Sequence, residues 1–102
     1  MGVIVNDTIS LKIGISKQQC YINIGYEPII LNKTKNRSNG ESEYIVSVTF
    51  AIYYDIESYT QGGDSIDKKK LSITVNSSDI NTNLYILLYD RLKLEYSSFI
   101  NV

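Results

Sequence analysis

The chain has 102 residues, a length that fits one domain of ordinary size. It carries 10 basic and 11 acidic side chains, so it lacks the excess of lysine and arginine with which proteins bind the phosphates of nucleic acids. It contains no histidine, which removes the commonest general base and the commonest zinc ligand, and we therefore expect no enzyme and no metal or other cofactor.

The first third of the chain predicts two strands joined by a short polar turn. Apolar and polar residues alternate over Thr8–Ile15, as is typical of a half-buried strand, and Ser16–Gln18 form the turn. A second alternating segment covers Cys20–Tyr26. Pro28 interrupts it because proline has no N–H to donate, so the arm that resumes at Ile29 either bends there or lies at a sheet edge. The residues expected to face inward are Ile9, Leu11, Ile13, Ile15, Cys20, Ile22, Ile24 and Tyr26.

The clearest strand is Tyr44–Tyr54, which alternates over its whole length. A strand with two apolar faces is central in its sheet or has its second face covered by a partner. One face presents Tyr44, Val46, Val48, Phe50, Ile52 and Tyr54. The other presents Ile45, Ser47, Thr49, Ala51 and Tyr53.

Two polar segments flank this strand and predict loops. We expect Asn32–Glu43, which contains an Asn-Gly turn signal, to be exposed and mobile. Ser58–Lys70 holds a Gly-Gly pair and predicts the second loop. The strand Leu71–Val75 follows it, and we expect this strand to form a long hairpin with Tyr44–Tyr54.

The pattern then changes from a period of two to helical spacing. Ser77 or Ser78 is the expected N-cap, and Asp79 would complement the helix dipole. The helix is expected to cover about residues 78–96, and Ser97–Val102 to form a short tail. The apolar stripe consists of Ile80, Leu84, Leu87, Leu88 and Leu92.

Strands followed by one helix predict a single α+β domain over residues 1–102. Its antiparallel sheet would have four to five strands within residues 1–76, and the C-terminal amphipathic helix would pack on it. The first residues lack a basic stretch followed by a long apolar one, so we expect no secretion through a signal peptide. The longest strongly apolar run, Leu84–Tyr89, is far shorter than the ~20 residues of a membrane-spanning helix, so we expect no membrane partner.

Few side chains remain that carry chemistry. The lone Cys20 is expected to be a small buried hydrophobe in a reducing compartment. Asp55 with Glu57, and Asp64 with Asp67, are pairs of acids, but a small sheet-and-helix domain has little room for a cleft between two catalytic carboxylates. We interpret these acids as solvated loop charges, and we expect no small-molecule substrate.

The apolar surface exceeds what one sheet and one helix need for a core. The apolar arc of the helix is broad, and tyrosine is enriched at protein interfaces because it is large and amphipathic. We therefore predict a protein-contact surface. The alternatives are that a thin sheet needs a broad cover, or that AT-rich coding enriches tyrosine and isoleucine. The predicted interface residues are Ile45, Tyr53, Tyr85, Ile86 and Tyr89.

Four segments resemble small structural proteins from the virions of tailed bacteriophages: Gly2–Leu11, Phe50–Tyr54, Leu71–Val75 and Leu88–Lys93. The AT-rich coding also resembles that of phages that infect AT-rich bacteria, including the crAss-like group. The resemblance implies a capsid auxiliary protein or a neck or tail component, assembled in the host cytoplasm. Its partners would be other virion proteins or copies of itself.

Two other functions stay open from the residues. The first is a small adaptor or inhibitor that binds one host protein. The second is a domain that binds single-stranded nucleic acid, because nine tyrosines can stack on bases. The only basic run, Lys68–Lys70, has acids close to it, which makes nucleic acid an unfavoured partner.

Overall fold

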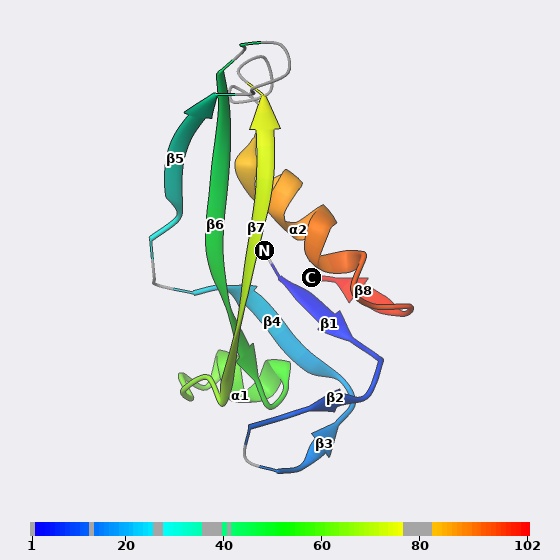
Figure 1. Cartoon of the computed structure of the whole chain (residues 1–102). Helices are drawn as coiled ribbons and strands as arrows, with labels where there is room; N and C mark the ends of the chain where they lie inside the picture. Colours follow the sequence, from blue (N-terminus) through cyan, green and yellow to red (C-terminus); the bar gives the residue numbers. More distant parts are fainter. Residues whose placement is uncertain (1, 13, 26–27, 36–39, 41, 77–82) are drawn as a thin grey trace.

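The computed structural model describes residues 2–12, 14–25, 28–35, 40, 42–76 and 83–102 (Figure 1). The elements in these residues make an α+β structure with a mostly antiparallel sheet, as the sequence predicts. The strands are β1 (Val3–Val5), β2 (Ile9–Ser10), β3 (Ser16–Lys17), β4 (Cys20–Ile24), β5 (Ile30–Lys35), β6 (Ser42–Tyr53), β7 (Asp67–Asn76) and β8 (Phe99–Asn101). The helices are α1 (Ile56–Thr60) and α2 (Leu84–Lys93).

The main sheet has six strands and is built around β6. Strand β7 pairs with one edge of β6 along almost its whole length. The other edge of β6 pairs first with β5 and then with β4, which are two successive segments of one arm. Strand β4 continues the sheet to β1 and then to β8, so that β5 and β8 lie on opposite sides of the molecule (Figure 1).

The predicted hairpin of two long strands is confirmed. The register of β6 and β7 runs from the pair Glu43–Asn76 to the pair Ile52–Asp67. Strand β7 therefore begins four residues before the predicted strand. Pro28 predicted either a bend or a sheet edge, and the structure shows the second, since the arm resumes after Pro28 as the edge strand β5 against the same partner strand as β4.

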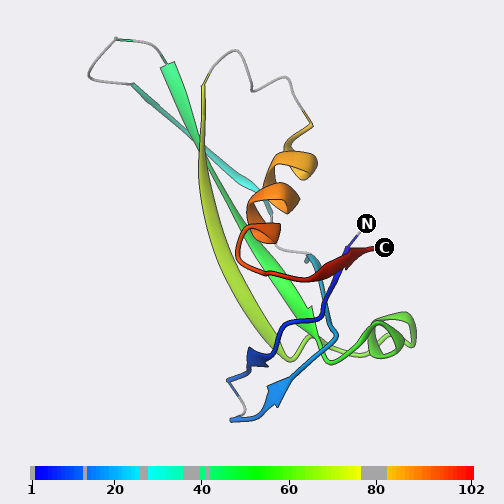
Figure 2. The ribbon, with the colours of Figure 1, turned by 90° about the vertical axis from the view of Figure 1, so that its right-hand side faces the viewer.

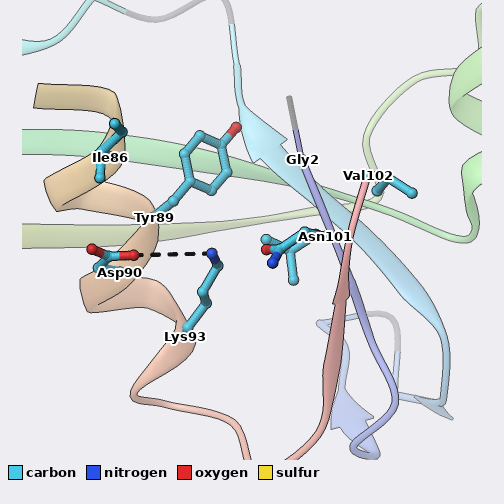
Figure 3. Close-up of a pocket in the computed structure, with 8 residues that line it drawn as sticks. Gly2, Ile86, Tyr89, Asp90, Lys93, Asn101 and Val102 are labelled. Atoms are coloured by element: carbon cyan, nitrogen blue, oxygen red, sulfur yellow. Dashed lines mark ion pairs between the residues drawn. The ribbon is translucent and has the colours of Figure 1, made fainter. Parts of the chain in front are cut away.

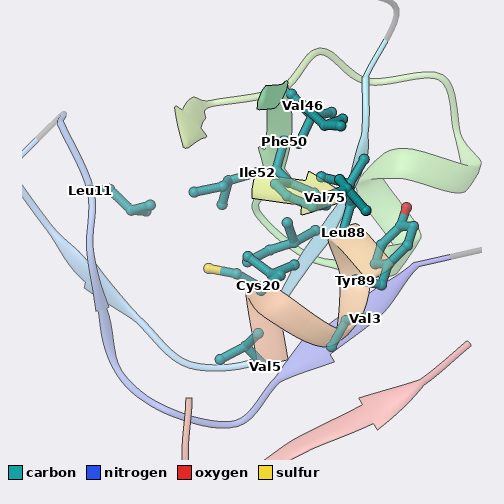
Figure 4. Close-up of a cluster of buried hydrophobic side chains, with 13 residues drawn as sticks. Val3, Val5, Leu11, Cys20, Val46, Phe50, Ile52, Val75, Leu88 and Tyr89 are labelled. Carbon is teal, nitrogen blue, oxygen red and sulfur yellow. The ribbon is translucent and has the colours of Figure 1, made fainter. Parts of the chain in front are cut away.

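One face of the sheet carries the main core, which α2 covers on the concave side of the β6–β7 ribbon (Figure 2). Cys20 is buried in this core, as the sequence predicts. Leu88 and Leu92 bring the centre of the helix stripe into it. The largest side chains that are fully buried are Phe50, Ile22, Leu88, Leu92, Val3, Val5, Val46 and Cys20 (Figure 4).

The helix is shorter than predicted. The side chain of Asn83 accepts a hydrogen bond from the N–H of Tyr85 at 3.0 Å and caps the first turn, so α2 begins at Leu84. It ends at Lys93, and residues after it form β8 instead of a tail. The predicted caps Ser77, Ser78 and Asp79 lie outside the described residues. The expectation of a helix over about 78–96 followed only by a tail is therefore wrong.

The predicted strand over Thr8–Ile15 is also wrong. Gly14 adopts a positive φ of 86°, and the chain reverses there, with the N–H of Leu11 donating to the carbonyl of Ile15 at 2.8 Å. The segment thus forms a small hairpin of β2 and β3, which includes Ser16–Lys17 of the predicted turn. Alternation alone did not reveal this reversal because Gly14 occupies a polar position of the pattern.

The second face of the sheet is covered at one end by a helix that the sequence did not predict. Helix α1 lies partly within the predicted loop Ser58–Lys70 and packs over a cluster of three buried residues, Tyr21, Ala51 and Tyr53. The other predicted loop, Asn32–Glu43, begins with residues of β5. The main sheet has more strands than the predicted four to five because β1 and β8, which lie in segments with no predicted strand, both join it.

Candidate interaction surface

Strand β8 is an edge strand whose outer side meets no other strand among the described residues. On its inner side, Gly2 and Val102 exchange both backbone hydrogen bonds, at 2.9 and 3.0 Å. Because residues alternate in an antiparallel ladder, Ile100 also points its backbone groups toward β1. The N–H and C=O groups of Phe99 and Asn101 therefore point outward, where they are free to bind an added strand.

A hollow of about 330 Å³ lies between α2 and the β1–β8 pair (Figure 3). Ile86 and Tyr89 supply its apolar wall on the helix, and Val102 lines it from the strand side. Asp90 and Lys93 form an ion pair at its rim, with 3.9 Å between Oδ1 and Nζ. We call this space the α2 hollow. Its shape and lining suit an apolar side chain from a neighbouring polypeptide.

A second hollow, of about 270 Å³, lies on the opposite face of the same strand pair, next to α1. Its apolar lining comes from Ile4, Ile56 and Ile100, and its polar lining includes the carboxylates of Asp55 and Glu57. We call this space the α1 hollow. One apolar hollow thus flanks β8 on each face, and the α1 hollow carries negative charge.

The charge of Asp55 is supported by the local structure. It is the N-cap of α1, and its Oδ1 accepts a hydrogen bond from the N–H of Ser58 at 2.7 Å. This bond lowers the pKa of Asp55, because it stabilises the ionised carboxylate. The carboxylate of Asp55 is thus engaged in capping α1. Glu57 lies exposed beside it and is the carboxylate better placed to meet a basic partner.

Three of the five predicted interface residues are exposed. Tyr85 and Ile86 of α2 are 51% and 48% exposed, and Ile86 lines the α2 hollow. Ile45 is 39% exposed but belongs to β6, away from β8. The structure therefore places Ile86 at the candidate surface, whereas Ile45 lies on a separate part of the sheet.

Tyr53 and Tyr89 are buried inside the monomer, which contradicts the expectation that they add exposed area. Tyr53 is 7% exposed because α1 covers it. The ring of Tyr59 packs edge-on against the ring of Tyr53, with 5.0 Å between the ring centroids. Tyr89 is 4% exposed, and its ring packs edge-on against the ring of Phe50, with 5.5 Å between the ring centroids. Tyr89 therefore lines the α2 hollow with the small part of its side chain that the core leaves exposed.

Strands β5 and β7 also have outer sides that pair with no strand in the described residues, and all six residues of β5 are exposed. Pro28 had indicated a sheet edge here, and that was the only sequence signal for it. Ile30 and Leu31 supply apolar side chains near the start of β5, and Lys33 and Lys35 supply positive charge farther along.

Cys20 and the metal-ligating side chains are the remaining groups to place among the described residues. Burial raises the pKa of the Cys20 thiol, which keeps it protonated and unreactive. Among the described side chains, no three metal-ligating residues lie together. Neither helix, over the residues described, is long and apolar enough to cross a membrane. The free edges of β5 and β8 and the hollows beside β8 are therefore the candidate contact features.

Comparison with known proteins found no similar protein. The sequence matches no family model, and no match was found among curated proteins or solved structures. The function must therefore be argued from this chain alone.

Proposed function

We propose that the chain is a structural assembly protein of a tailed-bacteriophage virion, such as a capsid auxiliary protein or a neck or tail component. It acts through protein–protein contacts with copies of itself or with other virion proteins. The observation that carries the contact role is the open sheet, in which β5 and β8 are each unpaired on their outer sides among the described residues, as β7 also is. The resemblance of the sequence to small virion proteins supports the setting.

Exposed edge strands favour association because they present rows of backbone donors and acceptors. The β5 and β8 edges also carry exposed large apolar residues, namely Ile30 and Leu31 on β5 and Phe99 and Ile100 on β8. Exposed apolar residues gathered at an edge are a feature of contact surfaces. The combination supports a protein whose edges are covered by neighbours.

The test is to measure the amount of the protein in purified particles. A virion component is expected in many copies per particle, at a fixed ratio to the major shell protein. An adaptor or inhibitor of a host protein would be absent from particles and would instead form a one-to-one complex in infected cells. Absence from particles would therefore contradict the proposal.

A second measurement separates assembly from nucleic-acid binding. The purified chain is applied to immobilised single-stranded DNA at low and at high salt. Binding through phosphates weakens steeply as salt rises. We expect no retention at low salt, because acidic side chains outnumber basic ones by one. Strong, salt-sensitive retention would contradict the proposal and favour a nucleic-acid-binding domain.

A further inference from the structure

We propose that β5 of one copy adds as a new strand to the free edge of β8 in the next copy, so that the chains join head to tail. This inference rests on the assembly role proposed above and names the contact through which copies of this chain meet. Addition of a strand to a free edge is a general mode of recognition. Backbone hydrogen bonds supply affinity, and pockets for alternate side chains supply specificity.

The β8 edge has both parts of such a site. The backbone groups of Phe99 and Asn101 point outward, which leaves them to pair with an incoming strand. The α2 hollow lies on one face of the β1–β8 pair and the α1 hollow on the other. Because side chains of a strand point alternately to the two faces of a sheet, successive residues of an added strand face the two hollows in turn.

Strand β5 fits this edge in shape. All of its residues are exposed, and its outer side is unpaired over the described chain. Leu31, Lys33 and Lys35 share one face of the strand, and Ile30 lies on the other, as the register with β6 shows. Each face thus offers one large apolar side chain near the start of the strand, and only one face is basic.

The charges select how the strand lies on the edge. The α1 hollow carries the carboxylates of Asp55 and Glu57, whereas the α2 hollow has a rim that is neutral overall, because Asp90 pairs with Lys93. The face with Lys33 and Lys35 therefore turns toward the α1 hollow. The opposite face, with Ile30, turns toward the apolar wall of the α2 hollow. Complementary charges across a contact favour this orientation over the reverse.

The β5–β8 contact joins two different surfaces, so a dimer cannot satisfy both surfaces of each copy. Strands β5 and β8 lie on opposite sides of the molecule, so each copy presents one donor edge and one acceptor edge (Figure 1). A contact between two different surfaces leaves one of each unused in a dimer. It therefore generates a ring, if the rotation closes, or an open chain of copies.

The experiment measures the mass of the full chain by native mass spectrometry and sedimentation over a range of concentrations at low salt. The wild-type chain is expected to form species above the dimer. Two charge reversals test the contact: Lys33→Glu with Lys35→Glu on β5, and Glu57→Lys on the α1 hollow. Each is expected to weaken association about tenfold or more, since like charges then face each other. Asp64→Lys makes a matched change outside the α1 hollow and is expected to leave association unchanged.

Mixing the two reversed variants gives the sharpest result. The acidic β5 of one variant then meets the lysine introduced into the α1 hollow of the other, and the two unchanged edges also fit, so the mixture is expected to assemble. A symmetric contact between two β5 strands would instead leave Glu57→Lys unaffected. That result, a monomeric wild-type chain, or wild-type association in both reversed variants would overturn the inference.

A backbone variant tests the β8 edge without charge. Asn101→Pro removes an outward N–H and leaves the inward bonds of Ile100 and Val102 in place, so it is expected to lower association while thermal unfolding stays cooperative. Presence of the protein in particles together with unchanged association in these variants would remove the β5–β8 contact and leave the assembly role intact. Absence from particles would contradict the assembly role itself.

Discussion

The hydroxyl of Tyr89 accepts a hydrogen bond from the backbone N–H of Ile24 at 2.8 Å, across 65 positions of the chain. The β1–β4 ladder ends at Ile22, so Ile24 lies beyond it. Helix α2 thus supplies the acceptor for an N–H that lies beyond the end of the β1–β4 ladder. This bond ties the helix to the sheet and fixes Tyr89 as a structural residue of the monomer.

Tyr89→Phe is expected to lower the free energy of unfolding by about 1–3 kcal/mol, because it leaves the N–H of Ile24 without this acceptor. The measurement is equilibrium unfolding in denaturant. Tyr85→Phe is the matched control, since Tyr85 is exposed on the same helix, and its effect is expected to stay within about 0.5 kcal/mol. Equal losses in the two variants would contradict the structural role of Tyr89.

Leu88→Ala is expected to destabilise the fold by roughly 2–5 kcal/mol, because it opens a cavity beneath α2. Leu84 is only partly buried at the edge of the same core, so Leu84→Ala is expected to cost less. Leu94, which is 80% exposed just after the helix, provides the control. Comparable denaturation midpoints for Leu88→Ala and Leu94→Ala would show that α2 does not pack as described.

Asp7 makes the folded state sensitive to acid. Its carboxylate accepts hydrogen bonds from the backbone N–H groups of Ser97 and Ser98, both at 2.9 Å, and from the hydroxyl of Ser97. The backbone bond from Ser97 is the main cause that lowers the pKa of Asp7 below its ordinary value of 3.8. A lowered folded-state pKa stabilises the fold fully above the ordinary value, and this stabilisation disappears as pH falls through the folded-state pKa.

Asp7→Asn is therefore expected to reduce stability at neutral pH and to flatten the loss of stability below about pH 4. The measurement is a series of denaturant unfolding curves from neutral to acidic pH. Ser97→Ala removes only the hydroxyl donor and keeps both backbone donors, so it is expected to retain most of the acid dependence. An acid dependence of Asp7→Asn that is as steep as that of the wild type would contradict this role.

The thiol of Cys20 is expected to react with a thiol reagent only when the structure opens. Cys20 is fully buried, and burial raises its pKa, which keeps the reactive thiolate scarce. The reaction rate is measured at neutral pH with increasing denaturant, and it should rise with the fraction unfolded. A native protein that reacts as fast as the denatured chain would show that Cys20 is accessible.

Much of the fold could be predicted because long elements reveal their period. The alternation over Tyr44–Tyr54 identified β6 and its inward face, and the inward positions of Cys20 and Ile22 on β4 are confirmed. Helical spacing likewise placed Leu88 and Leu92 in the core. In each case the pattern is local and repeats several times, so that neighbouring residues are enough to read it.

The sequence could not predict the candidate surface beside β8, apart from the helix residues Ile86 and Tyr89. Strands β1 and β8 have three residues each, too few to show a period, and they pair residues that are more than 90 positions apart. Burial of Tyr89 and exposure of Tyr85 depend on where α2 lies on the sheet, which periodicity leaves undecided on a helix that is apolar over a broad arc.

What the sequence determined by itself is the α+β class, the β6–β7 hairpin and the central residues of the core. What only the tertiary structure decided is which strands end the sheet, which tyrosines are inside, and where hollows form beside β8. The physical reason is that side-chain period is a property of neighbours in sequence. Edges and hollows arise from contacts between distant segments, which no local pattern records.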